Sequence, residues 1–195
     1  SNWSTDFLRF YHSETNYNIS KDNTTIGAEI YKGKKSFNFA IENPERGKID
    51  AALRDALEAI DKLPEDQDFV DLERDMTLAE PRVVKNNIEA IPLDLKTKIL
   101  SNNSAAASMY DFDIFGTFIC NYQSFRLINS NGLDKSSQSS PIYLEVKAVH
   151  NKSQVTVLET FGGEDFGYFN ERAFTESLMQ KIKYCSSEIV DVGPG

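Results

Sequence analysis

The pattern of apolar and polar residues predicts strands in the first part of the chain. Residues 5–19 are rich in aromatic side chains, Thr, Asn and Ser with some alternation, which indicates one or two strands. Residues 24–31 and 36–41 alternate apolar and polar positions, as half-buried strands do. Between them, Lys32-Gly33-Lys34 supplies the glycine that a tight turn needs. We therefore expect a β-hairpin here.

A helix is predicted directly after the hairpin. Asn43-Pro44 breaks the strand and can start a helix, because Asn caps helices and Pro is tolerated in the first turn. Leu63-Pro64 is expected to end it. The apolar residues between these limits recur at helical spacing and predict an amphipathic helix packed on the hairpin: Ile49, Leu53, Leu57 and Ile60.

The second half of the chain alternates between helical and β-rich stretches in larger blocks. Residues 83–100 have near-helical spacing interrupted by Pro92, and residues 101–109 can continue that helix. Residues 162–167 are expected to form a flexible turn before a final helix over residues 171–185, with Phe174, Leu178, Ile182 and Cys185 on one face. Four β-rich runs predict an antiparallel meander: residues 114–120, 123–128, 141–149 and 154–161.

These grouped elements predict an α+β fold of antiparallel sheets packed with amphipathic helices. One sheet region is the N-terminal hairpin with its helix, and the other is the C-terminal meander. We expect a strand-hairpin-helix subdomain over residues 1–75. The remaining helix, meander and C-terminal helix, over residues 76–195, are expected to pack as one unit.

The charge of the chain argues against two classes of partner. Its 30 acidic and 21 basic residues give a net charge of −9. Nucleic acids and anionic membranes both need clustered Lys and Arg, so we expect neither as a partner. Most of the excess lies in residues 42–80, with 13 acidic and 5 basic residues. This run is either a solvated helix face and linker or an acidic docking surface.

No recognisable catalytic set is present in the sequence. Neither His12 nor His150 belongs to an HExxH motif, and no serine lies in GxSxG. Cys120 lies in an apolar run and is predicted to be a buried thiol. Cys120 and Cys185 make no CxxC motif, which suits a reducing cytoplasm. No apolar stretch approaches the roughly 18–20 residues that span a bilayer.

The strongest turn signal is NSNG, within the stretch LINSNGLDKSSQ over residues 127–138. Asn and Gly readily adopt the positive φ that tight turns require. One interpretation is a hairpin turn that only fixes strand register. The other is that Asn129, Asn131, Gly132 and Gln138 line a cleft and hydrogen-bond a peptide backbone, with a neighbouring sheet edge that takes the peptide as an added strand.

Two segments resemble a known family. They are Gly27-Ala-Glu-Ile-Tyr31, followed by Gly33 and the Ala-rich residues 51–60, and Arg126-Leu-Ile-Asn-Ser-Asn-Gly132 with a following strand. Together with the order of elements, they resemble the N-terminal half of the TldD/PmbA family, historically called modulators of DNA gyrase. The resemblance implies a two-part protein whose C-terminal half carries an HExxxH helix and acts as a zinc peptidase on peptides, often in dimers of like or related subunits.

This sequence departs from that pattern because it has no HExxxH. Either the chain stops before the metal-binding half, which its turn-like end at residues 191–195 favours, or it is a complete, non-catalytic relative. In both cases no catalytic residue carries over, and zinc is expected only in the missing half. The implied partners are a peptide substrate and a second subunit, in a homodimer or a heterodimer of related subunits.

Three functional hypotheses follow. The first is a non-catalytic N-terminal region of a TldD/PmbA-like zinc peptidase that contributes peptide binding and subunit association in the cytoplasm. The alternative is a standalone protein- or peptide-binding module without enzymatic role. The third is an enzyme that uses a local serine with His12 or His150.

Overall fold

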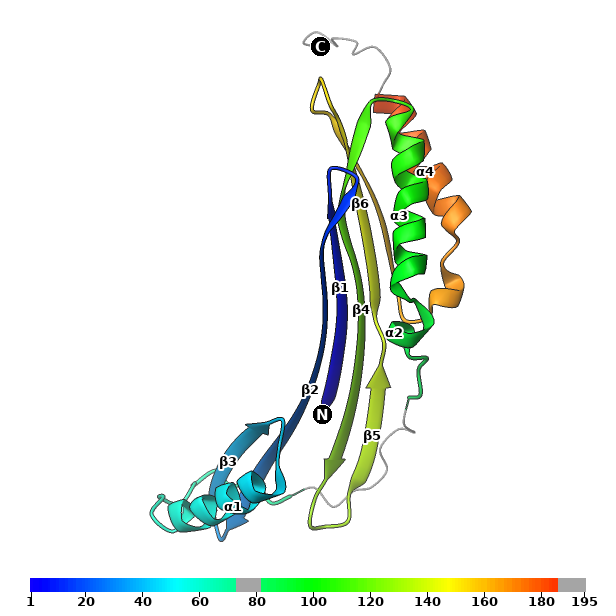
Figure 1. The fold of residues 1–195 in the computed structure, drawn as a ribbon. Helices are drawn as coiled ribbons and strands as arrows, with labels where there is room; N and C mark the ends of the chain where they lie inside the picture. Colours follow the sequence, from blue (N-terminus) through cyan, green and yellow to red (C-terminus); the bar gives the residue numbers. More distant parts are fainter. Residues whose placement is uncertain (73–81, 186–195) are drawn as a thin grey trace, which may run out of the picture. The chain divides into compact units, whose positions relative to one another are not determined.

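A computed structural model describes residues 1–72 and 82–185 of the chain (Figure 1). The predicted domain boundary between residues 75 and 76, and the turn-like end at residues 191–195, lie outside the described residues. The elements in chain order are β1 (Asn2–Tyr11), β2 (Glu14–Lys32), β3 (Lys35–Glu42), α1 (Arg46–Ile60), α2 (Asn87–Ala90), α3 (Leu93–Ser108), β4 (Phe112–Ile128), β5 (Asp134–Ser139), β6 (Ile142–His150), β7 (Thr156–Gly163), the 3-10 helix η1 (Phe166–Tyr168) and α4 (Glu171–Cys185).

The strands form a seven-stranded sheet in the order β3-β2-β1-β4-β6-β7, with β5 paired to β4. The pairs β2–β3, β4–β6 and β6–β7 are antiparallel. Because helices and antiparallel strands occupy separate blocks of the chain, the predicted α+β class is confirmed. The N-terminal hairpin and the C-terminal meander prove to share one sheet.

The chain divides into two compact units, each made of three separate segments, so that β1, β2, β4 and β5 contribute residues to both. Unit 1 comprises Ser1–Ser4, Asp22–Val83 and Gln123–Gln138. Unit 2 comprises Thr5–Lys21, Val84–Tyr122 and Ser139–Gly195.

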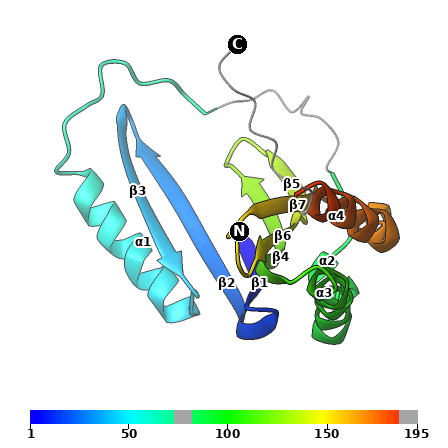
Figure 2. The same cartoon turned by 90° about the horizontal axis from the view of Figure 1, so that it is seen from above.

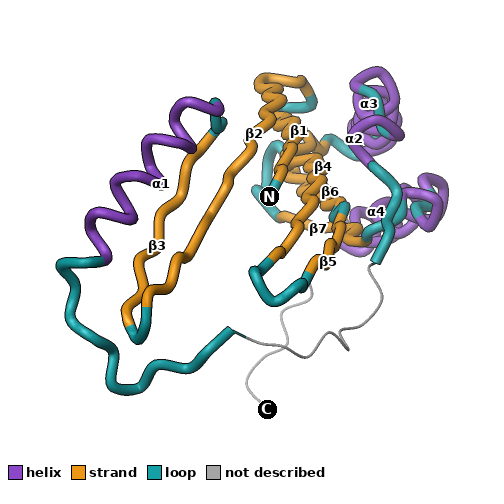
Figure 3. The backbone as a smooth tube through the Cα atoms, turned by 90° about the horizontal axis from the view of Figure 1, so that it is seen from below, coloured by secondary structure: helices purple, strands orange, loops and turns teal. Residues whose placement is uncertain are grey.

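In unit 1, α1 lies along the β2–β3 hairpin (Figure 3). The hairpin turns at Gly33, whose φ of +61° is in the left-handed region that favours glycine. Ile26, Ala28 and Ile30 of β2 lie opposite apolar residues of β3 in the register. The predicted amphipathic face of α1 is only partly correct: Ile60 is fully buried, but Leu57 is 57% exposed.

The start of α1 differs from the prediction. Asn43 adopts a φ of +47°, and its side-chain oxygen accepts a hydrogen bond from the Thr24 backbone N–H at 3.1 Å. Because this carboxamide closes the end of the hairpin, it cannot cap the helix, and Glu45 occupies the N-cap position without a side-chain bond. The helix also ends at Ile60, before the predicted Leu63-Pro64 stop.

In unit 2, α3 and α4 lie side by side over one face of the strands (Figure 2). Alternate strand residues point into this layer and are buried, which is the period of two expected of a half-buried strand. Helix residues including Ile99 and Leu178 complete the core. The strand contribution to this core includes Leu8, Phe10, Ile114, Phe118, Leu144 and Val146.

Two strands are longer than the sequence pattern predicted. β2 runs without a break from Glu14, so residues 24–31 are its second half. β4 runs without a break through both predicted runs, 114–120 and 123–128, because the polar residues between them stay in extended backbone. β4 also contains Gly116 at a φ of +150°, where an added Cβ would lie 2.0 Å from the Glu145 carbonyl oxygen.

The predicted interruption at Pro92 is present between α2 and α3, because proline lacks the N–H that a helix interior needs. Two smaller predictions are corrected around the helices. Residues 162–167 are divided between the end of β7 and the start of η1. Cys185 is exposed, although it was expected on the buried face of α4 with Phe174, Leu178 and Ile182.

Candidate functional site

The predicted NSNG turn connects β4 to β5 in unit 1, and its own side chains hold it. The side-chain oxygen of Asn129 accepts hydrogen bonds from the backbone N–H groups of Asn131 and Leu133, at 2.9 and 3.0 Å. The backbone N–H of Asn129 donates to the Leu133 carbonyl at 3.0 Å. Gly132 has a φ of +94°. The predicted turn is therefore present, and the side-chain oxygen of Asn129 stabilises it.

The four residues predicted to bind a peptide do not all come together. Asn129, Asn131 and Gly132 share the turn, and the Asn131 side-chain N–H donates to the Leu72 carbonyl at 3.1 Å. Gln138 lies four residues along β5 from Asp134, about 13 Å of extended strand. Its backbone N–H donates to the Arg82 carbonyl at 3.2 Å. The predicted set is thus spread along one hairpin.

The flanks of the β4–β5 hairpin combine a charged clamp with exposed apolar side chains. Arg126 donates two hydrogen bonds to the Asp134 carboxylate, at 2.8 and 2.7 Å. The bond from Arg126 lowers the pKa of Asp134, and the same bond raises the pKa of Arg126. Three apolar residues of β4 stay exposed beside this clamp: Phe125 at 47%, Leu127 at 46% and Ile128 at 65%.

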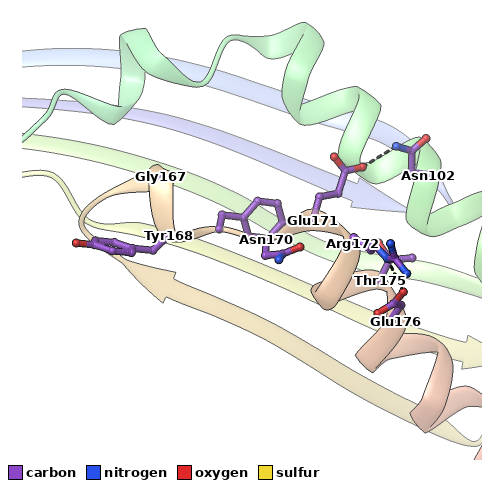
Figure 4. Close-up of a pocket in the computed structure, with 9 residues that line it drawn as sticks. Asn102, Gly167, Tyr168, Asn170, Glu171, Arg172, Thr175 and Glu176 are labelled. Carbon is purple, nitrogen blue, oxygen red and sulfur yellow. Dashed lines mark hydrogen bonds and ion pairs between the residues drawn. The ribbon is translucent and has the colours of Figure 1, made fainter.

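A shallow hollow in unit 2 lies where η1 leads into α4 (Figure 4). Asn102 of α3 donates to the Glu171 carboxylate at 2.6 Å across it. Arg172 donates to Glu176 at 2.7 Å, one helical turn apart. Tyr168 is 84% exposed at its edge. Arg172 and Glu176 therefore neutralise each other, and Glu171 is held by the Asn102 carboxamide.

A buried ion pair lies in the interior of unit 2. The Lys96 ammonium is fully buried, donates to the Asp6 carboxylate and lies 5.6 Å from the centre of the Phe118 ring. Cys120 is buried close by, as predicted, and burial raises the pKa of its thiol to about 11. The apolar run around Cys120 predicted its burial. Nothing in the spacing of Lys96 could have revealed a partner 90 positions away.

Both histidines lie at turns beside an aspartate. His12 Nδ1 lies 2.9 Å from an oxygen of Asp113. His150 Nδ1 lies 2.8 Å from the Ser153 hydroxyl and also accepts the Ser153 backbone N–H at 3.1 Å. His150 Nε2 is 3.9 Å from Asp111, longer than a hydrogen bond. The His150 contacts close the β6–β7 turn, and a ring nitrogen already accepting an N–H is poorly placed as a base for the same serine.

Within residues 1–72 and 82–185, no group of three or more His, Cys, Asp or Glu side chains could hold a metal ion. The zinc that the family resemblance implies was expected outside this chain, in the metal-binding half, and it stays a prediction. Across the same ranges, no helix combines the length and apolar character needed to cross a bilayer.

Comparison with solved structures shows the fold. The chain is similar to TldE from Thermococcus kodakarensis, with 15% identity and a TM-score of 0.68 over 94% of this chain and 43% of that one. It is also similar to a "putative modulator of a DNA gyrase" from Thermotoga maritima, with 11% identity and a TM-score of 0.69 over 93% of this chain and 42% of that one.

A third similar structure is a "putative modulator of DNA gyrase" from Bacteroides thetaiotaomicron, with 9% identity and a TM-score of 0.69, over 93% of this chain and 44% of that one. No protein-family model and no curated protein matches the sequence. The predicted resemblance to TldD/PmbA proteins is confirmed at the level of the fold. The chain spans less than half the length of the structures it matches.

Proposed function

We propose that the chain is the non-catalytic region of a TldD/PmbA-like zinc peptidase, and that it contributes peptide binding and subunit association. The observation that carries this proposal is the fold match, which includes nearly all of this chain but less than half of each similar structure. On this proposal the zinc and the bond-breaking residues belong to the remainder of a longer protein.

The β4–β5 hairpin is the element proposed to bind a peptide. An extended peptide is held mainly by backbone hydrogen bonds to a strand, with a few side-chain amides fixing its position. The Gln138 carboxamide has no partner among the described residues, and Asn131 uses only its N–H, on Leu72. These two amides are therefore better candidates for contact with a peptide than Asn129, whose oxygen holds the turn.

Peptide binding is tested with fluorescein-labelled octapeptides of random sequence, blocked at both ends, whose anisotropy is followed as the chain is added. We expect Gln138→Ala and Asn131→Ala each to weaken binding about fivefold, the equivalent of one hydrogen bond. Gln180→Ala, on the exposed side of α4, is the matched control and should leave binding unchanged. If all three variants bind the peptides as tightly as the parent chain, the β4–β5 hairpin is not the peptide-binding element.

Subunit association is proposed to use the exposed apolar side chains of β4. Phe125, Leu127 and Ile128 lie within four residues of one strand, where solvent-exposed apolar clusters commonly mark interfaces. Sedimentation velocity should show a dimer that Leu127→Ser with Ile128→Ser converts to a monomer. Leu57→Ser, on α1 at an exposure of 57%, between those of Leu127 and Ile128, should leave the dimer intact. A monomeric parent chain would refute association through this chain alone.

A further inference from the structure

The face of the unit 2 strands opposite α3 and α4 carries a hollow of about 760 Å³. Alternation assigns its residues to this face. Phe7, Arg9 and Tyr11 on β1 alternate with the buried Leu8 and Phe10. The same alternation places residues of β4 and β6 on this face between buried core residues. The side chains that line the hollow include Phe7, Arg9, Tyr11, Phe115, Glu145 and Lys147.

Aromatic rings form one part of the hollow. The Tyr11 and Phe115 rings meet edge to face with centroids 5.0 Å apart, and Tyr11 is 48% exposed. Phe7 lies four residues before Tyr11 on β1 and therefore on the same face. Such rings offer a planar ligand both apolar area and favourable ring contacts.

Two cations lie beside these rings. Lys147 is opposite Phe115 in the β4–β6 register, and Arg9 is two residues before Tyr11 on the same face. Neither has an ion-pair or hydrogen-bond partner within the described ranges 1–72 and 82–185. The acid of the hollow, Glu145, accepts the Tyr143 hydroxyl at 2.7 Å. Two unpaired cations against one acid make this hollow locally positive in a chain of charge −9.

The spacing of the cations suits one small ligand. β1 and β6 flank β4, so they are two strand spacings apart. Tyr11 contacts Phe115, Lys147 is opposite Phe115, and Arg9 lies two residues before Tyr11, so Arg9 is offset from Lys147 by about two residues. The Cα atoms of Arg9 and Lys147 are therefore about 12 Å apart. Both side chains are long enough to reach an anion held between them, and a guanidinium can bind a carboxylate or phosphate through two N–H groups.

We propose that this hollow binds a small aromatic anion, meaning a planar ring that carries a carboxylate or a phosphate. The ring packs against Phe7, Tyr11 and Phe115, and the anion lies between Arg9 and Lys147. Two sources share this chemistry: an aromatic residue that carries the terminal carboxylate of a peptide, and a nucleotide. The site lies in unit 2 and does not depend on the proposed role of the β4–β5 hairpin.

The test is a titration of the ¹⁵N-labelled chain by NMR with two anionic probes, N-acetyl-tryptophan and adenosine 5′-monophosphate, up to about 10 mM. Their neutral counterparts are N-acetyl-tryptophan amide and adenosine. We expect at least one anionic probe to shift the amides of Tyr11, Phe115 and Lys147 in a saturable way. Its neutral counterpart should bind at least about fivefold more weakly. The probe that saturates identifies the source.

Variants link the binding to the named side chains. Arg9→Gln and Lys147→Gln should each weaken the anionic probe about fivefold or more, while Lys98→Gln, an exposed cation on α3, should have no effect. Phe115→Leu, which keeps apolar bulk but loses the ring, should weaken both anionic and neutral probes. The proposal is overturned if no probe saturates, if the neutral probes bind equally well, or if Lys98→Gln weakens binding as much as Arg9→Gln. Preserved amide dispersion in each variant shows that the fold is intact.

Discussion

The buried pair of Lys96 and Asp6 makes a quantitative prediction about stability. The Lys96 side chain is fully buried and the Asp6 side chain is 13% exposed. Asp6→Asn leaves the ammonium without its carboxylate and without water, so it should cost about 3–5 kcal/mol of unfolding free energy. Lys96→Met should cost less, because the remaining carboxylate keeps some solvent and the Ser20 hydroxyl at 3.3 Å.

The double variant Asp6→Leu with Lys96→Met is the decisive comparison. Replacing a buried ion pair by apolar side chains of similar size is often neutral, so this variant should unfold within about 1–2 kcal/mol of the parent. Urea unfolding followed by circular dichroism measures all four proteins, and Asp6→Asn should lower the midpoint by roughly 1–2 M. The reasoning is wrong if Asp6→Asn unfolds like the parent, or if the double variant is no more stable than Asp6→Asn.

Three further predictions concern residues of unit 2. Gly116→Ala should lower the unfolding free energy by about 2–3 kcal/mol, measured by urea unfolding, because the added Cβ would meet the Glu145 carbonyl. The control Gly27→Ala should be neutral or slightly stabilising, because the space around the added Cβ is open. At pH 8 the native chain should react with a thiol reagent at the exposed Cys185 and not at Cys120, and a second reactive thiol in native protein would contradict the burial. The pKa of Cys120 in the folded chain, about 11, lies above its ordinary value of 9.0. The stability that this thiol contributes is therefore present below pH 9 and is lost as the pH rises to 11. The difference in unfolding free energy between the parent and Cys120→Ala should shrink across that range by at most about 2–3 kcal/mol, and a constant difference would contradict the raised pKa.

The local pattern of apolar residues predicted much of the fold, because a helix or strand buried on one face has apolar residues at regular spacing. The hairpin at Gly33 and α4 were predicted in this way, and α4 has the predicted bounds, Glu171–Cys185. The same reasoning divided β4 in two, because Asn121, between the two predicted runs, looks like a turn residue. A strand needs only one covered face and tolerates polar side chains on the other, so polarity alone does not mark a break.

The errors and omissions have a common cause in contacts between distant residues. The sequence around Asn43 predicts a helix cap, but in the structure its side-chain oxygen accepts a hydrogen bond from the Thr24 N–H of the neighbouring strand. By its type Lys96 is expected on the surface of a helix, but in the structure it is buried in an ion pair with Asp6 of β1. Neither partner is close in sequence, so no local pattern could reveal the pairing.

The candidate site shows the same limit. The NSNG turn was predicted from local chemistry, and Gly132 has the positive φ that the turn requires. The separation of Gln138 from Asn131 depends on how β5 pairs with β4, and β5 is too polar to be recognised by its pattern. The pairing of Phe115 with Lys147 in the open-face hollow likewise depends on strand register, which the sequence does not reveal.

The central claim is that this chain binds and associates while the bond-breaking residues belong elsewhere. The most direct measurement is mass spectrometry of a defined peptide mixture incubated with the purified chain and with a variant carrying His12→Ala and His150→Ala. We predict that the parent chain leaves every peptide intact over the time in which binding is detected. New peptide fragments produced by the parent and lost in the double histidine variant would contradict the claim.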